Sequence, residues 1–383
     1  MKKAGKIIGI VVAFFVIGGV GAIFMEHYVF PRMGMYRPFS QSEFFKNFSE
    51  NTTIITKTEQ VIITEPDSVN KVASQVATSV VSIVSRANQL NKKQSLINQI
   101  TEKTGNGFIV TSDGLIATYR DAIIEENATY KVMLFDGTIY DATLKGIDMF
   151  SNIAYLSISA INLSSVSFSN AQDFFSGKKV IAVGKSAENY QNRYAAGIIS
   201  DLDRTYNISG EITASSEKRE GVLDIDFADR SEFLGSPVVG YNGELVGMVG
   251  LSTVDNQMKF FAIPADAIKE SLDKIISGEI TTTPELGVHY ITVTPLYAAA
   301  HNLVQDHGAY VFSASGKQGL AILSGSAGEK AGVKIYDIIT AVNDSTIDLG
   351  NPLSNILNHF KKGETVSLTV FRDGQELRIN VTL

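Results

Sequence analysis

The stretch DIDFADRSEFLGSPVVGYNGELVGMVG, residues 224–250, carries the first clear structural signal in the chain. An acidic, polar run leads into Leu-Gly-Ser-Pro (234–237), and a Tyr-Asn-Gly-Glu turn (241–244) separates two valines from the apolar run 245–249. This pattern predicts two strands joined by a tight turn. A serine beside glycine and proline, just before a strand, is a place for a nucleophile, so Ser236 and Ser231 are the first candidates.

The same kind of signal extends outward from this stretch. Between residues 105 and 263, short apolar runs recur at intervals of about 8–12 residues with glycine-containing turns between them, which is typical of a sandwich or barrel. Helical spacing appears before these strands, in residues 68–78, and after them, in residues 265–276 ahead of Gly278. The predicted class is therefore mainly β.

Composition excludes several functions. The chain has 383 residues, enough for two or three domains, and its net charge is −7 without a long basic block, which argues against nucleic acid as a partner. It has no cysteine and no phosphate-binding glycine motif. Its five histidines lack the spacing of a metal site, so neither a metal nor a cofactor is expected. They are His27, His289, His301, His307 and His359.

The N-terminus predicts a membrane anchor. Residues 7–25 are an uninterrupted apolar run of about the length needed to cross a bilayer, and they follow three lysines in residues 1–6. We expect residues 1–6 to be cytoplasmic, 7–25 to be a transmembrane signal anchor and 26–66 to be a juxtamembrane linker, with the rest of the chain on the extracytoplasmic side. A cleaved signal peptide is the alternative.

Taken in order, the turns resemble those of the HtrA family, which are trypsin-like serine proteases with a C-terminal PDZ domain. The resemblance implies a trypsin-like double β-barrel over residues 67–278. The matching segments are GNGFIVTSDGLIAT (105–118), MLFDGTIYDATLKGID (133–148), GKKVIAVG (177–184), AAGIIS (195–200), PVVGYNGELVGM (237–248) and FAIP (261–264).

The chemistry of that family is a Ser-His-Asp triad, in which a base activates the serine and a carboxylate orients the base. By resemblance the histidine, aspartate and serine positions correspond to Asp121, Asn152 and Leu234, so all three are replaced. No histidine lies between residues 28 and 288. Glu232 stands where a glycine helps to form the oxyanion pocket, and a carboxylate there would repel the developing charge. We therefore predict a pseudoprotease, not an enzyme.

After a linker at 279–285, residues 286–383 resemble the α+β PDZ domain of the same family, most closely in GSAGEKAGVKIYDIITAVND (325–344). PDZ domains bind a free C-terminus as an added strand, with the carboxylate held by loop N–H groups. The resemblance implies that Glu285, Leu286, Gly287 and Val288 form this loop. The groove wall is then expected from Ile291, Leu353, Ile356, Leu357 and Phe360.

These features predict a membrane-anchored protein that binds C-terminal peptides or misfolded proteins as an adaptor, scaffold or regulator of envelope quality control. Assembly as a homotrimer or a mixed oligomer with active relatives is implied by the resemblance. Two alternatives stay open: a purely structural envelope protein, and an active peptidase that uses Ser236 with a lysine. The lysines considered are Lys103, Lys131, Lys145 and Lys185.

Overall fold

The computed structural model describes residues 17–29, 65–87, 102–170, 174–186, 189, 191–211, 213–227, 230–254, 257–280 and 283–383. Residues 17–24 are helical, and a short π-helix, Met25–Val29, follows them. Among the residues that the structure describes, no helix is both long and apolar enough to span a bilayer. Part of the predicted anchor, residues 7–16, lies outside the described residues, so the anchor stays a prediction.

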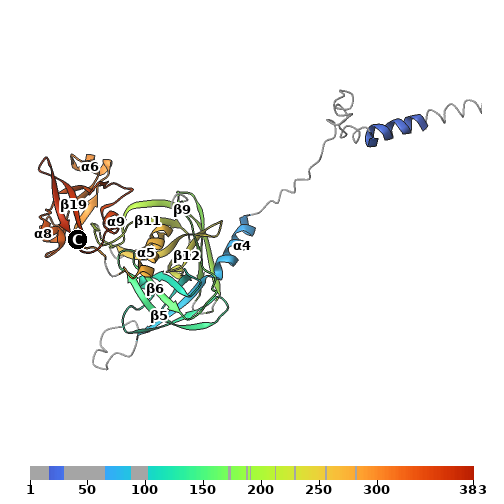
Figure 1. The fold of residues 1–383 in the computed structure, drawn as a ribbon, viewed down its shortest axis with the longest axis horizontal. Coiled ribbons are helices and arrows are strands. Elements are labelled where there is room, and N and C mark those ends of the chain that lie inside the picture. The colour runs from blue at the N-terminus through green and yellow to red at the C-terminus, as the bar shows by residue number, and fades with distance from the viewer. Residues whose placement is uncertain are drawn as a thin grey trace, which may run out of the picture. The chain divides into compact units, whose positions relative to one another are not determined.

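A first β-barrel follows the helix α4, Glu65–Ala77 (Figure 1). Its six strands close in the order β1-β2-β3-β6-β5-β4. Alternate positions of β5 are more and less exposed, as expected when one face of a strand lines a core. The strands are β1 Val80–Ala87, β2 Glu102–Ile109, β3 Leu115–Tyr119, β4 Ala128–Met133, β5 Ile139–Asp148 and β6 Ile153–Ile158.

The second sheet has the order β12-β8-β9-β11-β14-β13-β7, and the further pairing of β12 with β13 makes it a second barrel. The opening stretch supplies β12 and β13 with the predicted turn between them, so that prediction is confirmed. The strands are β7 Ser167–Phe168, β8 Lys179–Lys185, β9 Asn192–Asn207, β11 Glu220–Asp226, β12 Pro237–Gly240, β13 Glu244–Val254 and β14 Gln257–Pro264. The helix α5, Ala265–Ser277, then ends at Gly278, whose φ of 77° suits a helix cap that only glycine adopts easily.

One buried cluster joins the two barrels. Phe108, Tyr119 and Tyr155 of the first barrel pack with residues of the second, including Met248 and Phe261. Burial of this apolar surface fixes the loops of both barrels against one another, so residues of either barrel meet at the cleft between them.

The C-terminal unit, orange to red in Figure 1, is a separate α+β unit with its own core. Its sheet runs β15-β16-β17-β19-β20, and a strand from the barrel region, β10 (Ala214–Ser215), adds to its edge beside β15. The other strands are β15 His289–Thr292, β16 Ala309–Val311, β17 Ile338–Val342, β18 Ser345–Thr346, β19 Thr365–Arg372 and β20 Gln375–Thr382. The helices are α6 Pro295–His301, α7 Gln318–Ala321, α8 Ala327–Ala331 and α9 Leu353–Leu357.

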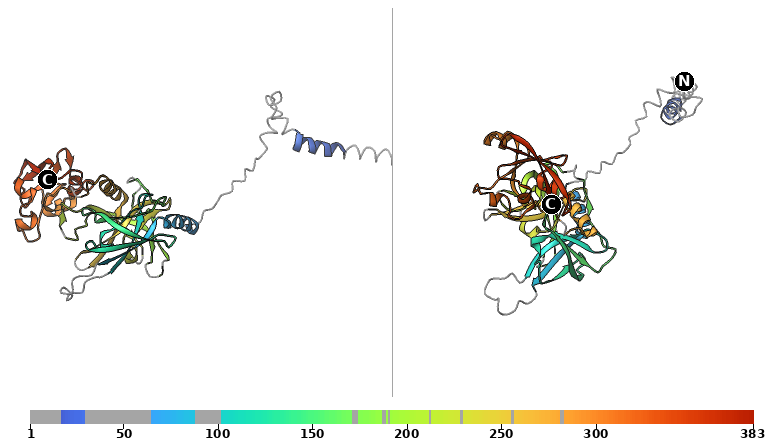
Figure 2. Two further views of the ribbon diagram at one scale, coloured as in Figure 1. Left: turned by 60° about the horizontal axis from the view of Figure 1, so that its bottom comes forward. Right: turned by 60° about the vertical axis from the view of Figure 1, so that its left-hand side comes forward.

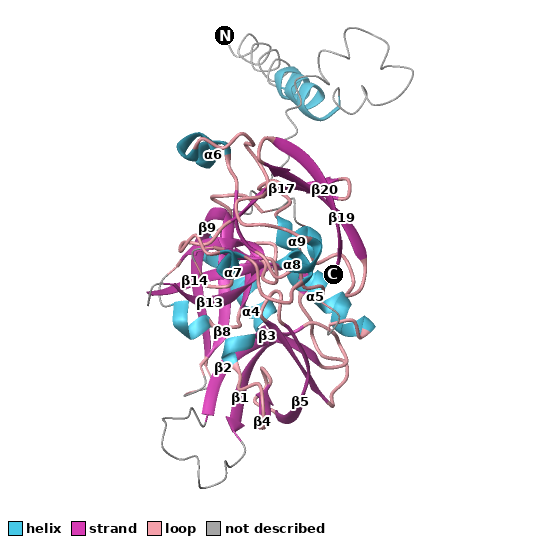
Figure 3. Cartoon of the chain, turned by 90° about the vertical axis from the view of Figure 1, so that its left-hand side faces the viewer, coloured by secondary structure: helices cyan, strands magenta, loops and turns pink. Residues whose placement is uncertain are grey.

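Figures 2 and 3 show the long hairpin of β19 and β20 as the outer wall of this unit, with the short helices α8 and α9 on its inner side in Figure 3. The mainly β class, with two barrels and a separate α+β unit, agrees with the sequence-based prediction. The boundaries that we assigned to the domains stay predictions.

Candidate functional site

The three positions matched to the triad lie on separate loops. Asp121 is exposed in a 3-10 turn, Arg120–Ala122, directly after β3. Asn152 is largely buried ahead of β6, and its φ of 54° is in the left-handed region that asparagine tolerates. Leu234 follows the 3-10 turn Arg230–Phe233 and packs against the core that joins the barrels.

Asn152 accepts a hydrogen bond from Lys218, a residue to which no sequence motif pointed. The Nζ atom of Lys218 donates to Oδ1 of Asn152 at 2.9 Å and to the carbonyl of Met149 at 2.5 Å. Burial lowers the pKa of Lys218, and the positive charge of Arg120 lowers it further. A lysine with a lowered pKa is the kind of group that serves as a base in enzymes.

Tyr119 lies on the other side of Asn152. Its hydroxyl donates to the carbonyl of Leu251 at 2.8 Å and accepts from Nδ2 of Asn152 at 3.4 Å. Burial raises the pKa of this hydroxyl, so it stays protonated and acts as a donor near neutral pH.

Asn106 holds the loop around Leu234. Its backbone N–H donates to the carbonyl of Leu234 at 3.1 Å, and its side-chain Nδ2 donates to the carbonyl of Glu232 at 3.0 Å. Gly235 has a φ of 78°, and a Cβ added there would stand 2.2 Å from the carbonyl oxygen of Asn106. Only glycine therefore lets the loop approach Asn106 this closely.

A small cavity of about 200 Å³ opens beside this loop. Ser231, Glu232 and Leu234 line it, and Arg193 forms an ion pair with Glu232 at its edge. The carboxylate of Glu232 is thus paired with a guanidinium, so its charge is compensated.

The two candidate serines differ in access. Ser231 is exposed, whereas Ser236 is fully buried and its hydroxyl has no hydrogen-bond partner among the described residues. Three of the four lysines considered with Ser236 bind elsewhere, because Lys103 and Lys185 donate to backbone carbonyls and Lys131 pairs with Asp141. In the part of the chain that the structure describes, no activating group therefore binds the hydroxyl of Ser236.

The residues expected to form a peptide groove gather around β15. The apolar ones that share the buried core of the C-terminal unit are Leu286, Val288, Leu353, Ile356 and Leu357, with Phe360 packed against them. Glu285 is exposed and Ile291 is half-buried. Gly287 has a φ of 73°, and a Cβ added there would stand 2.3 Å from Cβ of Ser326.

A segment of the barrel region that no sequence pattern placed there covers the edge of β15. Strand β10 pairs with it in antiparallel register, with Ala214 opposite Tyr290 and Ser215 opposite His289. The paired residues lie about 75 positions apart in the chain, and no local pattern signals such a contact.

A buried carboxylate also joins β11 to the C-terminal unit. Glu220 is almost completely buried and accepts hydrogen bonds from the hydroxyls of Tyr290 at 2.7 Å and Thr292 at 2.5 Å. Burial raises the pKa of Glu220 to about 7. The backbone N–H of Glu220 donates to Oδ1 of Asn355 in α9 at 3.2 Å. In return, Nδ2 of Asn355 donates to the backbone carbonyl of Glu220 at 2.8 Å.

Comparison with known families assigns both units. The trypsin-like peptidase domain family matches residues 105–248, and the PDZ domain family matches residues 284–383. These matches confirm the predicted trypsin-like double barrel followed by a PDZ domain.

Curated relatives are similar to this chain over about three quarters of its length. The chain is 29% identical over 290 residues to the "Serine protease Do-like HtrA" of Bacillus subtilis, covering 74% of this chain and 61% of the relative. It is 28% identical over 283 residues to the "Probable periplasmic serine endoprotease DegP-like" of Rhizobium meliloti, covering 73% of this chain and 53% of the relative. The chain thus matches somewhat more than half the length of each of these relatives.

Solved structures show a similar fold. The "HtrA-type protease AlgW with tripeptide" superposes with a TM-score of 0.63 at 21% identity, covering 82% of this chain and 95% of that one. The "HtrA-type protease AlgW with decapeptide" gives 0.60 at 19% identity, covering 82% and 97%.

The relatives contradict our prediction that the chain is not an enzyme, and we correct it. They are named as serine proteases or endoproteases, and nothing in the comparisons shows that the triad is replaced. The physical reason for the error is that we equated the absence of histidine with the absence of a base. Folding brings Lys218 to Asn152, and a distant lysine of this kind cannot be found from a motif.

Proposed function

We propose that this chain, which joins a trypsin-like peptidase domain to a PDZ domain as HtrA-type proteases do, binds the C-termini of misfolded proteins through its PDZ domain. Its work is then protein quality control in the cell envelope. The observation that carries the proposal is the loop before β15, where the backbone N–H of Gly287 binds a carboxylate oxygen, that of Glu217, at 2.7 Å.

The surroundings of that loop suit a peptide end. An extended peptide adds to a sheet edge through main-chain hydrogen bonds, and its side chains need an apolar wall beside the strand. Val288 of the loop and Leu353, Ile356 and Leu357 of α9 supply such a wall within one buried cluster. Glu285, Leu286, Ile291 and Phe360 complete the set of residues that we assign to peptide binding.

The location follows from the relatives and from the N-terminal sequence. Relatives are named as periplasmic endoproteases, and residues 7–25 have the length and apolarity of a signal anchor. We propose a single-pass protein whose two folded domains are extracytoplasmic. Assembly as a trimer, or with active relatives, belongs to the same proposal.

Hydrolysis of peptide bonds is the second candidate function. The names of the relatives favour it, and so does Lys218, the buried lysine with a lowered pKa beside Asn152. Ser231 is exposed and lines the cavity beside Leu234, so it is a better candidate nucleophile than the buried Ser236.

Peptide binding is tested with the full-length chain and fluorescent nonapeptides that end in three apolar residues. We expect binding of the peptides with a free carboxylate and none of the same peptides with a terminal amide. Gly287→Ala should abolish binding, because the new Cβ meets Ser326, whereas Gly319→Ala, at a position with open space, should leave it unchanged. Equal binding of acid and amide peptides would refute the proposal.

Hydrolysis is tested with casein and a fluorophosphonate probe. Activity that survives Ser236→Ala but is lost in both Ser231→Ala and Lys218→Met would support the second candidate. Activity that both of the latter variants retain would exclude these residues from the reaction.

A further inference from the structure

Residues 214–217, which we call the internal strand, occupy the edge of β15. Besides the pairing of Ala214 with Tyr290, the N–H of Ser216 donates to the carbonyl of Val288 at 3.0 Å. In return the N–H of Val288 donates to Oγ of Ser216 at 2.9 Å. The main-chain groups through which a peptide would add to this edge are therefore already in use.

The direction of the internal strand is that of a bound C-terminus. It runs antiparallel to β15, from Ala214 opposite Tyr290 toward Glu217 at the loop. Ala214 is 7% exposed and belongs to the buried cluster of the C-terminal unit, together with Val288 and Leu353. Its side chain is therefore buried in the same cluster as the residues assigned to the groove wall.

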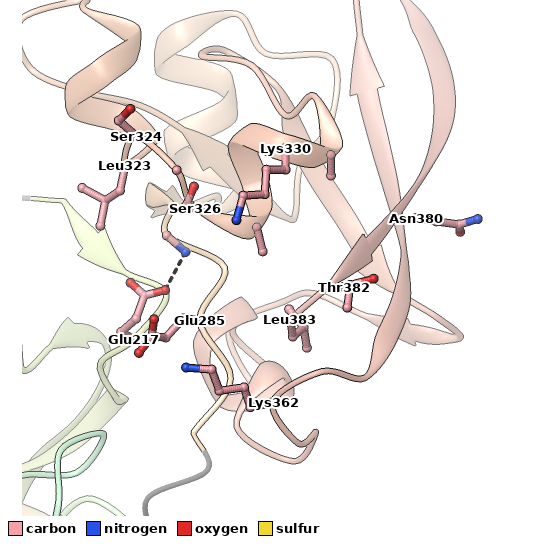
Figure 4. A pocket seen from close by; sticks show the side chains of 14 residues that line it. Glu217, Glu285, Leu323, Ser324, Ser326, Lys330, Lys362, Asn380, Thr382 and Leu383 are labelled. Atoms are coloured by element: carbon pink, nitrogen blue, oxygen red, sulfur yellow. Dashed lines mark hydrogen bonds between the residues drawn. The ribbon is translucent and has the colours of Figure 1, made fainter.

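A carboxylate stands at the end of this strand, where a peptide would present its own. Oε1 of Glu217 accepts a hydrogen bond from the N–H of Gly287 at 2.7 Å (Figure 4). The hydroxyls of Ser215 and Ser216 donate to the two oxygens of Glu217, at 2.9 and 2.7 Å, and so orient the carboxylate. Hydrogen bonds to a charged acceptor are about twice as strong as neutral ones.

The cavity around this carboxylate is large enough for a peptide end. It has a volume of about 780 Å³ and is lined by Glu217, Gly287, Lys330 and Lys362 among other residues (Figure 4). The two lysines face two carboxylates, Glu217 and Glu285, so an incoming carboxylate would compete with Glu217 for the same positive charge and the same N–H group.

We propose that the internal strand is a built-in ligand of the PDZ domain, with the side chain of Glu217 in place of a terminal carboxylate. A peptide that ends in a free carboxylate must displace residues 214–217 before it binds. This inference rests on the proposed function, because it assigns the regulation of that same peptide site.

The internal strand competes from within the same chain, so it loses little freedom on binding and its effective concentration is high. The affinity measured for an external peptide is then reduced by the fraction of molecules in which the groove is open. Weakening the internal strand should raise that fraction and tighten external binding.

Displacement of the internal strand would also affect the first barrel. Lys218 follows Glu217 directly and donates to Asn152 of the first barrel. A peptide that lifts residues 214–217 from the groove would therefore pull on Lys218 and on its contact with Asn152. The groove and the position of Asn152 are thus linked through this short segment of chain.

The experiment measures binding of the fluorescent nonapeptides, as acids and as amides, to the full-length chain by anisotropy. We compare the wild type with Glu217→Gln, Glu217→Ala and the charge-matched control Glu376→Gln, whose side chain lies on the outer hairpin. Glu217→Ala should bind the acid peptides about ten- to a hundredfold more tightly than the wild type, because the internal strand loses its charge-assisted hydrogen bond to the N–H of Gly287. Glu217→Gln should lie between them, and Glu376→Gln should match the wild type.

Equal affinity in the wild type and both Glu217 variants would overturn this inference and leave the proposed function standing. Failure of every acid peptide to bind any variant would overturn the proposed function. Hydrogen exchange without peptide separates these cases further, since the amides of Gly287 and Val288 should exchange faster in Glu217→Ala than in the wild type. Unchanged exchange there would show that Glu217 does not hold the internal strand in place.

Discussion

The carboxylate of Glu217 and the backbone nitrogen of Gly287 lie 2.7 Å apart, although 70 positions separate them in the chain. The first belongs to the barrel region and the second to the loop of the PDZ domain. Lys218, the neighbour of Glu217, reaches in the other direction to Asn152. One short segment therefore contacts both the loop at Gly287 and the loop at Asn152, so a displacement of residues 217–218 would disturb both contacts.

The loop around Leu234 should depend on the glycine that follows it. Gly235→Ala places a Cβ against the carbonyl of Asn106 at a φ of 78°, which should cost roughly 2–5 kcal/mol of unfolding free energy. Gly137→Ala is the matched control, because Gly137 also has a positive φ but open space around it, and should cost only about 1 kcal/mol. Urea unfolding measures both, and equal losses would show that the contact with Asn106 is unimportant.

Glu220 should make stability fall as the pH rises. Its pKa is about 7 in the folded chain because of burial, with the charge of Asp203 a smaller cause, against about 4.3 in an unfolded chain. The folded state thus binds more protons between these values, so the stabilisation is complete below about pH 4 and is lost as the pH passes through 7.

The full change attributable to Glu220, from its protonated to its ionised form, should be about 4 kcal/mol, since the folded and unfolded pKa values differ by nearly three units and each unit corresponds to about 1.4 kcal/mol. Glu220→Gln, which stays neutral, should remove this slope while keeping an acceptor for the Tyr290 hydroxyl. Thermal melts of both proteins at pH 5 and pH 7.5 provide the measurement. Parallel pH profiles would mean that Glu220 is not the titrating group.

Local sequence patterns predicted those turns and helix ends that depend only on neighbouring residues. The Asn-Gly turn at 242–243 separates β12 from β13, and Gly278 ends α5, as expected from turn and capping chemistry. The contacts of Glu217, Lys218 and Glu220 were not predictable, because each joins residues about 70 positions apart: Glu217 and Glu220 contact the PDZ domain, and Lys218 contacts the first barrel. For the same reason, matching the triad positions by motif did not decide whether the chain is active. A motif compares residues in their order along the chain and does not show which side chains folding brings beside them.

The PDZ domain should depend on one buried ion pair. Asp337, with a side chain only 1% exposed, accepts hydrogen bonds from Nε and Nη2 of Arg372 at 2.6 and 2.7 Å. Asp337→Ala leaves the guanidinium without its partner and should cost about 3 kcal/mol. Asp141→Ala, which breaks the exposed pair with Lys131, should cost less than about 1 kcal/mol. Similar losses in urea unfolding would contradict the assigned burial of Asp337.

Lys218 should make stability rise with pH, whereas Glu220 makes it fall. Burial lowers its pKa in the folded chain, whereas an unfolded lysine titrates near 10.4. Between the lowered value and about 10.4 the unfolded chain binds more protons, so stability rises with pH over that range. The wild type should therefore gain stability over Lys218→Met as the pH rises toward about 10.4, measured by urea unfolding at a series of alkaline pH values. Lys131→Met, at an exposed ion pair, controls for the loss of any lysine. A constant difference between the wild type and Lys218→Met would mean that this lysine keeps its proton throughout, which would also remove the main argument for its role as a base.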